Sequence, residues 1–318
     1  MKIFQTWRDL PQEARGAVVV LGNFDGVHLG HAYLLRAAHT ARPDARLAVL
    51  TFEPHPREVF RPDDPPFRLT LAAERADALA ACGVELLFEM PFDSGFSYRT
   101  AEDFVFEILH DGIGARHLAA GVDFAFGYRR GGDAGFLAAR AEALGIGLTL
   151  VPALADAQGP LSSTRIRRAL QDGYPERATA DLGRPWTIRG EVAHGDKRGR
   201  TIGFPTANIQ LGRHLEPARG VYAVTIRLPD GSEHAGVANI GRRPTVNEGL
   251  ESRLEVNIFD YAGDLYGQEL AVSLHAFLRP EQKFSGLDEL RARIAADALQ
   301  ARKTLAERTA FAAAQSEA

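Results

Sequence analysis

Between Gly16 and Gly173, short apolar runs alternate five times with segments of helical periodicity, and this alternation constrains the fold more than any other feature. The apolar runs occupy residues 17–24, 46–54, 84–92, 116–124 and 147–154. The helical segments occupy residues 30–41, 69–83, 100–114, 132–145 and 163–173. Near-continuous apolar runs are typical of strands buried on both faces, and alternating β and α segments form a parallel sheet covered by helices. Ligands of such sheets bind beyond the carboxyl ends of the strands.

The pattern changes after Leu182, where apolar and polar residues begin to alternate as they do in half-buried strands. The alternating segments occupy residues 186–194, 220–228, 232–241, 253–261 and 268–279. The turn 228–233 (LPDGSE) predicts a hairpin, and residues 285–305 have helical spacing with Ser285 placed as the N-cap. We therefore predict two domains: a parallel α/β domain over 1–182, and a small antiparallel β-barrel with a terminal helix over 183–318.

The bulk composition is that of a soluble globular protein, with 45% hydrophobic and 25% charged residues among 318. The net charge of −4 argues against nucleic acid as a partner. The single cysteine, Cys82, excludes an internal disulfide and a cysteine-based zinc cluster. Neither a membrane-spanning stretch nor an apolar signal core is found, so we predict a cytoplasmic protein without a membrane partner. The oligomeric state stays open.

The stretch GNFDGVHLGH, residues 22–31, lies where the first buried strand gives way to a helix. A helix start offers unpaired N–H groups and the positive end of the helix dipole, which suit a phosphate group. His28 and His31 share one face there, and the glycines leave the backbone open to a ligand. A metal site at the two histidines, or two plain surface histidines, are the alternatives.

A second polar helix start is LSSTRIRRAL, residues 161–170. Helix capping accounts for one of its hydroxyl groups. Arg167 lies where cations are disfavoured unless an anion compensates them, and an anion held between Arg167 and the histidines would do so.

Together these stretches resemble the nucleotidyltransferases that transfer AMP from ATP. The first motif of that superfamily, H-x-G-H, matches residues 28–31, and its second, I-S-S-T-x-x-R, matches residues 161–167 with Leu161 in place of Ile. The resemblance implies a Rossmann-like fold and a catalytic role for His28, His31 and Arg167. The residues expected to bind ATP or its phosphates in this half are Gly22, Asn23, Phe24, Gly26, Gly30, Asp123, Ser163 and Thr164.

The string HGDKRGRTIGFPTAN, residues 194–208, contains Gly195, Gly199 and Gly203 among basic residues. A loop of this kind wraps phosphates with its backbone N–H groups, although a plain glycine-rich turn is an equal alternative. Pro205 favours an extended path that places Thr206 and Asn208 on one side. Their oxygens are hard ligands suited to Mg²⁺ shared with phosphate oxygens.

Glu255 alternates with apolar residues in RLEVNIFDY, and by itself such a residue usually meets water. The surrounding region, from residue 183 to FLRPEQKF, is similar to the bacterial riboflavin kinase module. The P-T-A-N of that module matches residues 205–208, and its catalytic glutamate matches Glu255. Asn257 replaces the histidine that the module usually carries.

The complete chain resembles the bifunctional bacterial family that joins riboflavin kinase to FAD synthetase. In the first half, FEPHP and FGYRRGGD also match, which implies flavin contacts from Pro54, His55, Pro56 and Arg130. For His55 a tight strand-ending turn is an almost equal alternative. Ala125 stands where many members carry arginine.

The implied chemistry has two steps, with riboflavin, FMN and ATP as substrates and Mg²⁺ as the cofactor. The barrel would phosphorylate riboflavin, with Glu255 as the base and Thr206 and Asn208 on the metal. The α/β domain would join FMN to AMP and release pyrophosphate. An alcohol must lose a proton before it attacks, whereas a phosphate is already ionised, so only the barrel needs a carboxylate base.

Two other functions fit parts of the sequence. The chain could be an adenylyltransferase for another small phosphate, with the barrel as a binding module. It could also be a flavin-binding regulator without activity. The presence of Thr206, Asn208 and Glu255 argues against the first, and the intact His28, His31, Arg167 and Glu255 argue against the second.

Overall fold

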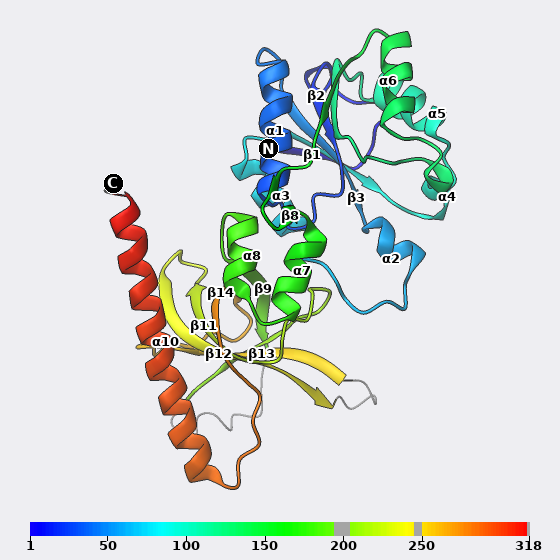
Figure 1. Cartoon of the computed structure of the whole chain (residues 1–318). Coiled ribbons are helices and arrows are strands. Elements are labelled where there is room, and N and C mark those ends of the chain that lie inside the picture. Colours follow the sequence, from blue (N-terminus) through cyan, green and yellow to red (C-terminus); the bar gives the residue numbers. More distant parts are fainter. Residues whose placement is uncertain (194–203, 245–249, 317–318) are drawn as a thin grey trace. The chain divides into compact units, whose positions relative to one another are not determined.

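The structure is a computed structural model that describes residues 1–193, 204–244 and 250–316 (Figure 1). The chain forms two compact units. The first comprises Met1–Pro65 and Thr70–Ser162, and the second comprises Pro66–Leu69 and Ser163–Ala318. The units therefore divide after Ser162, whereas the sequence led us to expect a boundary after Leu182. That the two activities divide at Leu182 stays a prediction.

A six-stranded parallel sheet forms the centre of the first unit, in the order β1-β4-β3-β2-β5-β6. Its strands are β1 (Lys2–Phe4), β2 (Val18–Leu21), β3 (Leu47–Glu53), β4 (Leu86–Pro91), β5 (His117–Gly121) and β6 (Gly147–Val151). Because β3 and β4 lie on one side of β2 while β5 and β6 lie on the other, the strand order reverses between β2 and β5. Such a reversal is where open α/β sheets bind their ligands.

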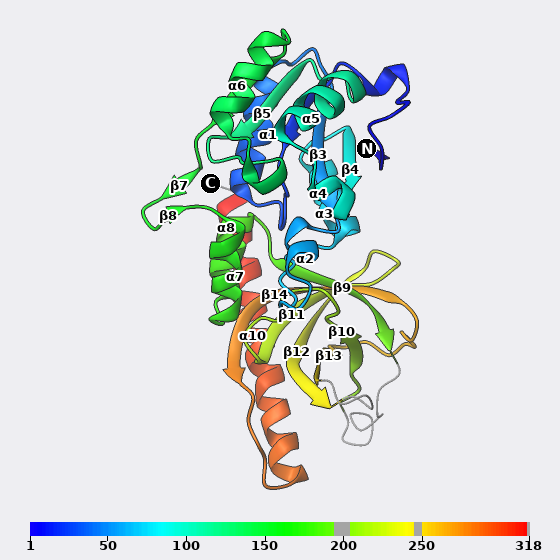
Figure 2. The ribbon, with the colours of Figure 1, turned by 90° about the vertical axis from the view of Figure 1, so that its right-hand side faces the viewer.

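Helices and short turns connect these strands. The helices are α1 (Leu29–Ala41), α2 (Pro56–Phe60), α3 (Ala72–Ala81), α4 (Ser94–Ser97), α5 (Ala101–Asp103) and α6 (Ala134–Ala143). Helix α5 continues into η2 (Phe104–Gly112), which is wound as a π-helix. The shorter elements are the 3₁₀ turns η1 (Gln12–Ala14) and η3 (Tyr128–Arg130) and the β7 (Ala155–Asp156) and β8 (Gly159–Pro160) hairpin, seen best in Figure 2.

Two apolar layers cover the sheet, one on each face. Val19 and Leu21 of β2 belong to the layer that contains η2 and α6, while Val18 and Val20 belong to the layer that contains α1 and α3. Alternate residues of one strand thus enter different cores. This explains why the strands are apolar at most positions.

The second unit is a closed six-stranded antiparallel barrel in the order β10-β13-β12-β11-β14-β9. Its strands are β9 (Trp186–Ala193), β10 (Ala207–Gln210), β11 (Gly220–Arg227), β12 (Glu233–Pro244), β13 (Leu250–Ile258) and β14 (Glu269–Pro280). Helices α7 (Ser163–Gln171) and α8 (Pro175–Leu182) precede it. The predicted hairpin turn joins β11 to β12, where Gly231 adopts a φ of 85°. The predicted fold class is confirmed.

Helix α10 (Leu287–Ser316) packs along the outside of the barrel (Figure 1). Ala301 and Leu305 lie against Val221 and Val237, which point outward from their strands. The helix begins two residues after Ser285, whose hydroxyl donates to the Glu289 carboxylate at 2.7 Å. The N-cap of α10 is therefore Gly286, and Ser285, which we expected to be the N-cap, lies one residue before it.

Among the described residues, no helix combines the length and the apolarity that crossing a membrane requires.

Candidate active sites

The turn after β2 has an unusual backbone that buried hydrogen bonds hold in place. Phe24, Gly26 and Val27 have φ values of 52°, 86° and 43°. A positive φ is uncommon outside glycine, and for a β-branched residue such as Val27 it marks a strained site. The carboxylate of Asp25, which is 2% exposed, accepts from the Thr70 amide at 3.1 Å, and the Gly26 amide donates to the Thr70 hydroxyl at 2.9 Å.

His28 and His31 cap the start of α1 for each other. The His31 amide donates to Nδ1 of His28 at 3.3 Å, and the His28 amide donates to Nδ1 of His31 at 3.2 Å. The rings stack with their centroids 3.7 Å apart. Because each Nδ1 accepts a hydrogen bond, each ring carries its proton on Nε2. The two imidazole rings thus lie side by side at the helix start.

A pocket opens at the reversal point of the sheet, and it brings together residues that the sequence predicts for ATP. Residues after β2, β5 and β6 form its wall together with the start of α1. The predicted residues that line it are Gly22, Phe24, His28, Gly30, His31 and Asp123. Asn23 and Gly26 do not line it; Asn23 accepts at its carbonyl from the Thr51 hydroxyl at 3.1 Å.

The predicted flavin residues lie elsewhere in the first unit. His55, which is 8% exposed, caps α2 by accepting from the Arg57 amide at 3.1 Å, and Pro54 and Pro56 flank it. Arg130 is exposed in η3, with a φ of 59°. None of these four residues lines the pocket at the histidines.

A buried arginine network supports the strand end that leads into His55. Arg75 is fully buried, and its guanidinium contacts the carboxylates of Glu89 at 2.7 Å and Glu53 at 3.0 Å. The same group donates to the Phe52 carbonyl at 3.2 Å. Glu53 belongs to the matched FEPHP stretch, but its partnership with Arg75 and Glu89 was not predicted, because the three side chains come from separate elements.

Ser163 and Thr164, at the start of α7, and Arg167, one turn further along it, belong to the second unit. The Nε of Arg167 donates to the Phe67 carbonyl at 2.8 Å, and its guanidinium lies 5.2 Å from the centre of the Phe67 ring. The Pro66–Leu69 segment therefore orients this arginine within its own unit. The expected anion between Arg167 and the histidines stays a prediction.

In the barrel, register places three polar residues in one row. Glu255 of β13 is the direct partner of Asn208 on β10 and of Asn239 on β12. Directly opposite residues point to the same face, with Cβ atoms about 4.5–5.5 Å apart. Their neighbours Ala207, Ile240 and Val256 lie in the barrel core, so the row faces outward. Asn208 is 9% exposed and Glu255 is half-buried, so Glu255 is not simply turned to water.

Thr206 stands on the same side as Asn208, as expected, because Ala207 between them enters the core. The Asn208 amide nitrogen donates to the Thr206 carbonyl at 3.4 Å, which leaves the amide oxygen as an acceptor. Asn257, the departure from the kinase module, donates to the Pro205 carbonyl at 2.8 Å and so helps to hold this strand start.

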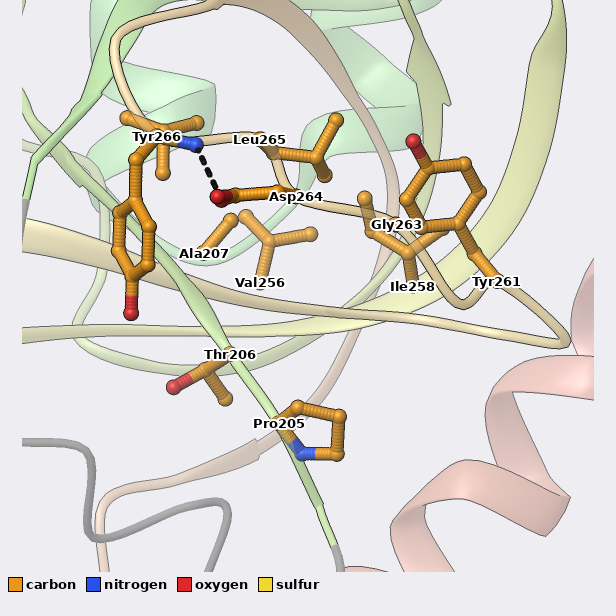
Figure 3. Close-up of a pocket in the computed structure, with 11 residues that line it drawn as sticks. Pro205, Thr206, Ala207, Val256, Ile258, Tyr261, Gly263, Asp264, Leu265 and Tyr266 are labelled. Carbon is orange, nitrogen blue, oxygen red and sulfur yellow. Dashed lines mark hydrogen bonds between the residues drawn. The ribbon is translucent and has the colours of Figure 1, made fainter.

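A second pocket lies at the end of the barrel that contains Thr206 (Figure 3). Pro205 and Thr206 lie at one side, and the rings of Tyr261 and Tyr266 flank it. The Tyr266 amide donates to the Asp264 carboxylate at 3.2 Å, which orders the loop. An apolar wall with two aromatic rings beside a hydroxyl suits a nucleoside that carries phosphates.

The sequence suggested two metal sites, one at His28 and His31 and one at Thr206 and Asn208. In the part of the chain that the structure describes, no three His, Cys, Asp or Glu side chains gather as a metal site, which leaves the metal alternative for His28 and His31 without support. Thr206 and Asn208 supply two hard oxygens, and Mg²⁺ commonly binds with few protein ligands plus phosphate and water. These two residues fit that ion. Gly195, Gly199 and Gly203 lie outside the described residues.

Sequence reasoning missed Asp25, Thr70 and Asn239. Asp25 stands inside the recognised stretch, and a charged residue in an otherwise apolar and glycine-rich turn was a signal. Thr70 and Asn239 reach their sites only through the fold, since one is 44 residues from Gly26 and the other lies on a different strand from Glu255.

Comparison with known proteins identifies a family for each half of the chain. Residues 10–165 match the model of the FAD synthetase family, and residues 182–305 match that of the riboflavin kinase family. The chain is 43% identical over 295 residues to the bifunctional riboflavin kinase/FMN adenylyltransferase of Escherichia coli K12, covering 92% of this chain and 93% of that protein. It is 42% identical over 309 residues to the protein of the same name from Pseudomonas fluorescens, covering 95% and 97%.

A solved structure has a similar fold over nearly the whole chain. The crystal structure of a protein described as a macrolide-efflux protein from Streptococcus pneumoniae covers 93% of this chain and 96% of its own, with a TM-score of 0.83 and 36% identity. Both catalytic modules are thus present in order, over nearly the full length of the relatives. The chain belongs to the family of bifunctional riboflavin kinases/FMN adenylyltransferases.

Proposed function

We propose that this enzyme carries out its two reactions at separate sites, one in the β-α repeats of the first half of the chain and one in the barrel of the second half. The barrel phosphorylates riboflavin, and the α/β half joins FMN to AMP. The observation that carries this proposal is the placement of the one predicted carboxylate base. Glu255 on β13 lies directly opposite Asn208 on the neighbouring strand β10. The pocket in the α/β half is instead lined by the imidazole rings of His28 and His31.

In the barrel, Glu255 accepts the proton of the ribityl 5′-hydroxyl as that oxygen attacks the γ-phosphorus of ATP. The new O–P bond forms while the bond to the β-phosphate oxygen breaks, which gives FMN and ADP. Thr206 and Asn208 would hold Mg²⁺, which when bound neutralises charge on the ATP phosphates. The pocket with Tyr261 and Tyr266 takes the nucleoside, and Thr206, which also lines it, would then lie near the ATP phosphates.

In the α/β half, a phosphate oxygen of FMN attacks the α-phosphorus of ATP, and pyrophosphate leaves. The attacking oxygen is already ionised, so the residues need only orient the phosphates and stabilise the added negative charge. His28 and His31 donate from Nε2, and Arg167, Ser163 and Thr164 supply the remaining charge and hydroxyls. Gly22, Phe24, Gly30 and Asp123 form the surrounding ATP site, and Asn23 and Gly26 belong to the turn that shapes it. Pro54, His55, Pro56 and Arg130 contact the flavin.

The test uses two variants of the full chain and separates FMN from FAD by chromatography. Glu255→Gln should lower riboflavin phosphorylation by about 10²- to 10⁴-fold, the usual contribution of a positioned base, while FMN is still converted to FAD. His28→Ala with His31→Ala should do the reverse. If either variant remains folded yet loses both activities, the two-site proposal is wrong. Flavin binding without any turnover by the unaltered chain would favour a regulator.

A further inference from the structure

Asn239 is the polar residue beside Glu255 for which no sequence motif assigned a role. It is the direct cross-strand partner of Glu255, on the side opposite Asn208. Its neighbours Ala238 and Ile240 lie in the barrel core, so its amide points outward with the Glu255 carboxylate. The three side chains thus form one continuous polar row over β10, β13 and β12.

The Asn239 amide is half-buried and makes no hydrogen bond to any of the described residues. A partly buried amide usually finds a partner, because leaving its donors and acceptor unpaired costs free energy. The other two asparagines of this face do have partners: Asn208 bonds to Thr206, and Asn257 bonds to Pro205. Asn239 therefore differs from its neighbours in having both amide atoms available to a ligand.

A second polar group approaches the same place. Gly241 follows Asn239 by two residues on β12, so a side chain at position 241 would lie on the same face as Asn239. A Cβ on Gly241 would meet the carboxylate of Glu281 and would lie 3.4 Å from Nδ2 of Asn239. The missing side chain thus lets the Glu281 carboxylate come close to the Asn239 amide.

We propose that Asn239 binds the hydroxyl next to the one that reacts, the 4′-hydroxyl of the ribityl chain, and that Glu281 borders this polyol subsite. Vicinal hydroxyls each need a donor and an acceptor, and an amide supplies both. With the 4′-hydroxyl held by Asn239, the 5′-hydroxyl lies toward Glu255, one strand away. Asn239 is thus a substrate-binding and specificity-determining residue. This inference rests on the proposed kinase role of Glu255.

The test measures riboflavin phosphorylation by Asn239→Ala in the full chain, with riboflavin and with 4′-deoxyriboflavin. Loss of one hydrogen bond to an uncharged hydroxyl should raise the KM for riboflavin by about 3- to 10-fold, with the KM for ATP unchanged. The unaltered chain should prefer riboflavin to the deoxy analogue by a similar factor, and the variant should show no preference. FMN adenylylation by the same variant should be unchanged.

Thr187→Ala is the matched control, because Thr187 is a half-buried polar residue of β9 that bonds to Ser273 away from this row. It should leave both KM values unchanged. The inference is overturned if Asn239→Ala still prefers riboflavin to the deoxy analogue as strongly as the unaltered chain does, or if it raises both KM values equally. If Glu255→Gln retains full kinase activity, the proposed kinase site itself is wrong, whatever Asn239→Ala does.

Discussion

Gly30 lies inside the reciprocal cap formed by His28 and His31. A Cβ at this position would lie 3.0 Å from both Cε1 and Nδ1 of the His28 ring, closer than such atoms normally approach. The sequence suggested that this glycine opens the backbone to phosphate. The structure adds a different reason, because a side chain would displace the imidazole.

We expect Gly30→Ala to lower FMN adenylylation by about 10-fold or more, since a displaced ring cannot keep both its cap and its Nε2 donor in place. Riboflavin phosphorylation by the same protein should be unchanged. Both rates are measured by chromatography of the flavins.

Gly135→Ala is the matched control, because Gly135 is the second residue of α6, as Gly30 is of α1. A Cβ at Gly135 would lie 3.4 Å from the Asp133 cap, an ordinary contact. Equal losses in the two variants would show that the effect comes from helix stability and not from His28.

At the scale of elements, buried charges attach α10 to the barrel. Asp297 is 3% exposed, and its carboxylate accepts three hydrogen bonds from Arg279 of β14, at 2.7, 3.0 and 3.1 Å. Arg293 contacts the same carboxylate at 3.1 Å. Removing one partner of such a pair leaves the others without compensation.

We expect Asp297→Ala to lower the free energy of unfolding of the barrel by about 3–5 kcal/mol, the usual cost of leaving a buried charge unpaired. Chemical denaturation followed by circular dichroism measures the change. Lys303→Ala removes an exposed α10 pair, with Glu307 at 3.9 Å, and should change the same quantity by less than about 0.5 kcal/mol. A similar loss in both variants would contradict the assignment.

The Pro66–Leu69 segment is the second informative element. It lies in the first half of the sequence, yet it packs within the second unit. Trp186 Nε1 donates to the Leu69 carbonyl at 2.8 Å, and the Leu215 amide donates to the Arg68 carbonyl at 2.8 Å. The segment also orients Arg167, whose Nε donates to the Phe67 carbonyl. The position of residues 66–69 in the sequence therefore does not reveal that they stabilise the second unit.

At the scale of the whole molecule, each unit contains a histidine with a lowered pKa, buried in the case of His117 and half-buried in the case of His275. Burial lowers the pKa of His275 to about 4, assisted by Arg308 and opposed by Glu233. Burial, with a smaller contribution from Arg42, also lowers the pKa of His117, which pairs with the Thr149 hydroxyl at 2.8 Å. The His275 ring therefore stays neutral in the folded chain at pH values where the unfolded chain takes up a proton, and the lowered pKa of His117 acts in the same direction.

Stability should therefore fall as the pH falls below about 6.5, the ordinary pKa of histidine, and for His275 this loss continues down to about pH 4. Between pH 7 and pH 5, His275 alone should lower the free energy of unfolding by about 2 kcal/mol. Calorimetry across this range measures the loss. His275→Gln should reduce the pH dependence of the barrel transition; an unchanged dependence would show that His275 is not its source.

Much of this enzyme followed from local patterns. The five β-α repeats predicted the parallel sheet, because strands covered on both faces are near-continuously apolar. The alternation after Leu182 predicted the barrel, and the motifs at His28 and Glu255 predicted the sites. These signals are local in the chain, where periodicity and helix-start chemistry are written directly in the order of residues.

Only the tertiary structure decided which distant residues meet. Strand register placed Asn239 beside Glu255, and a one-residue shift would have turned either side chain into the core. Packing across separate elements joined Arg75 to Glu53 and Glu89, and brought Thr70 to Asp25. The sequence alone predicted the two modules, because short-range patterns encode their elements, and the family that its motifs resemble implied their chemistry. The partners of each site required the fold, because pairing across strands depends on where the whole chain lies.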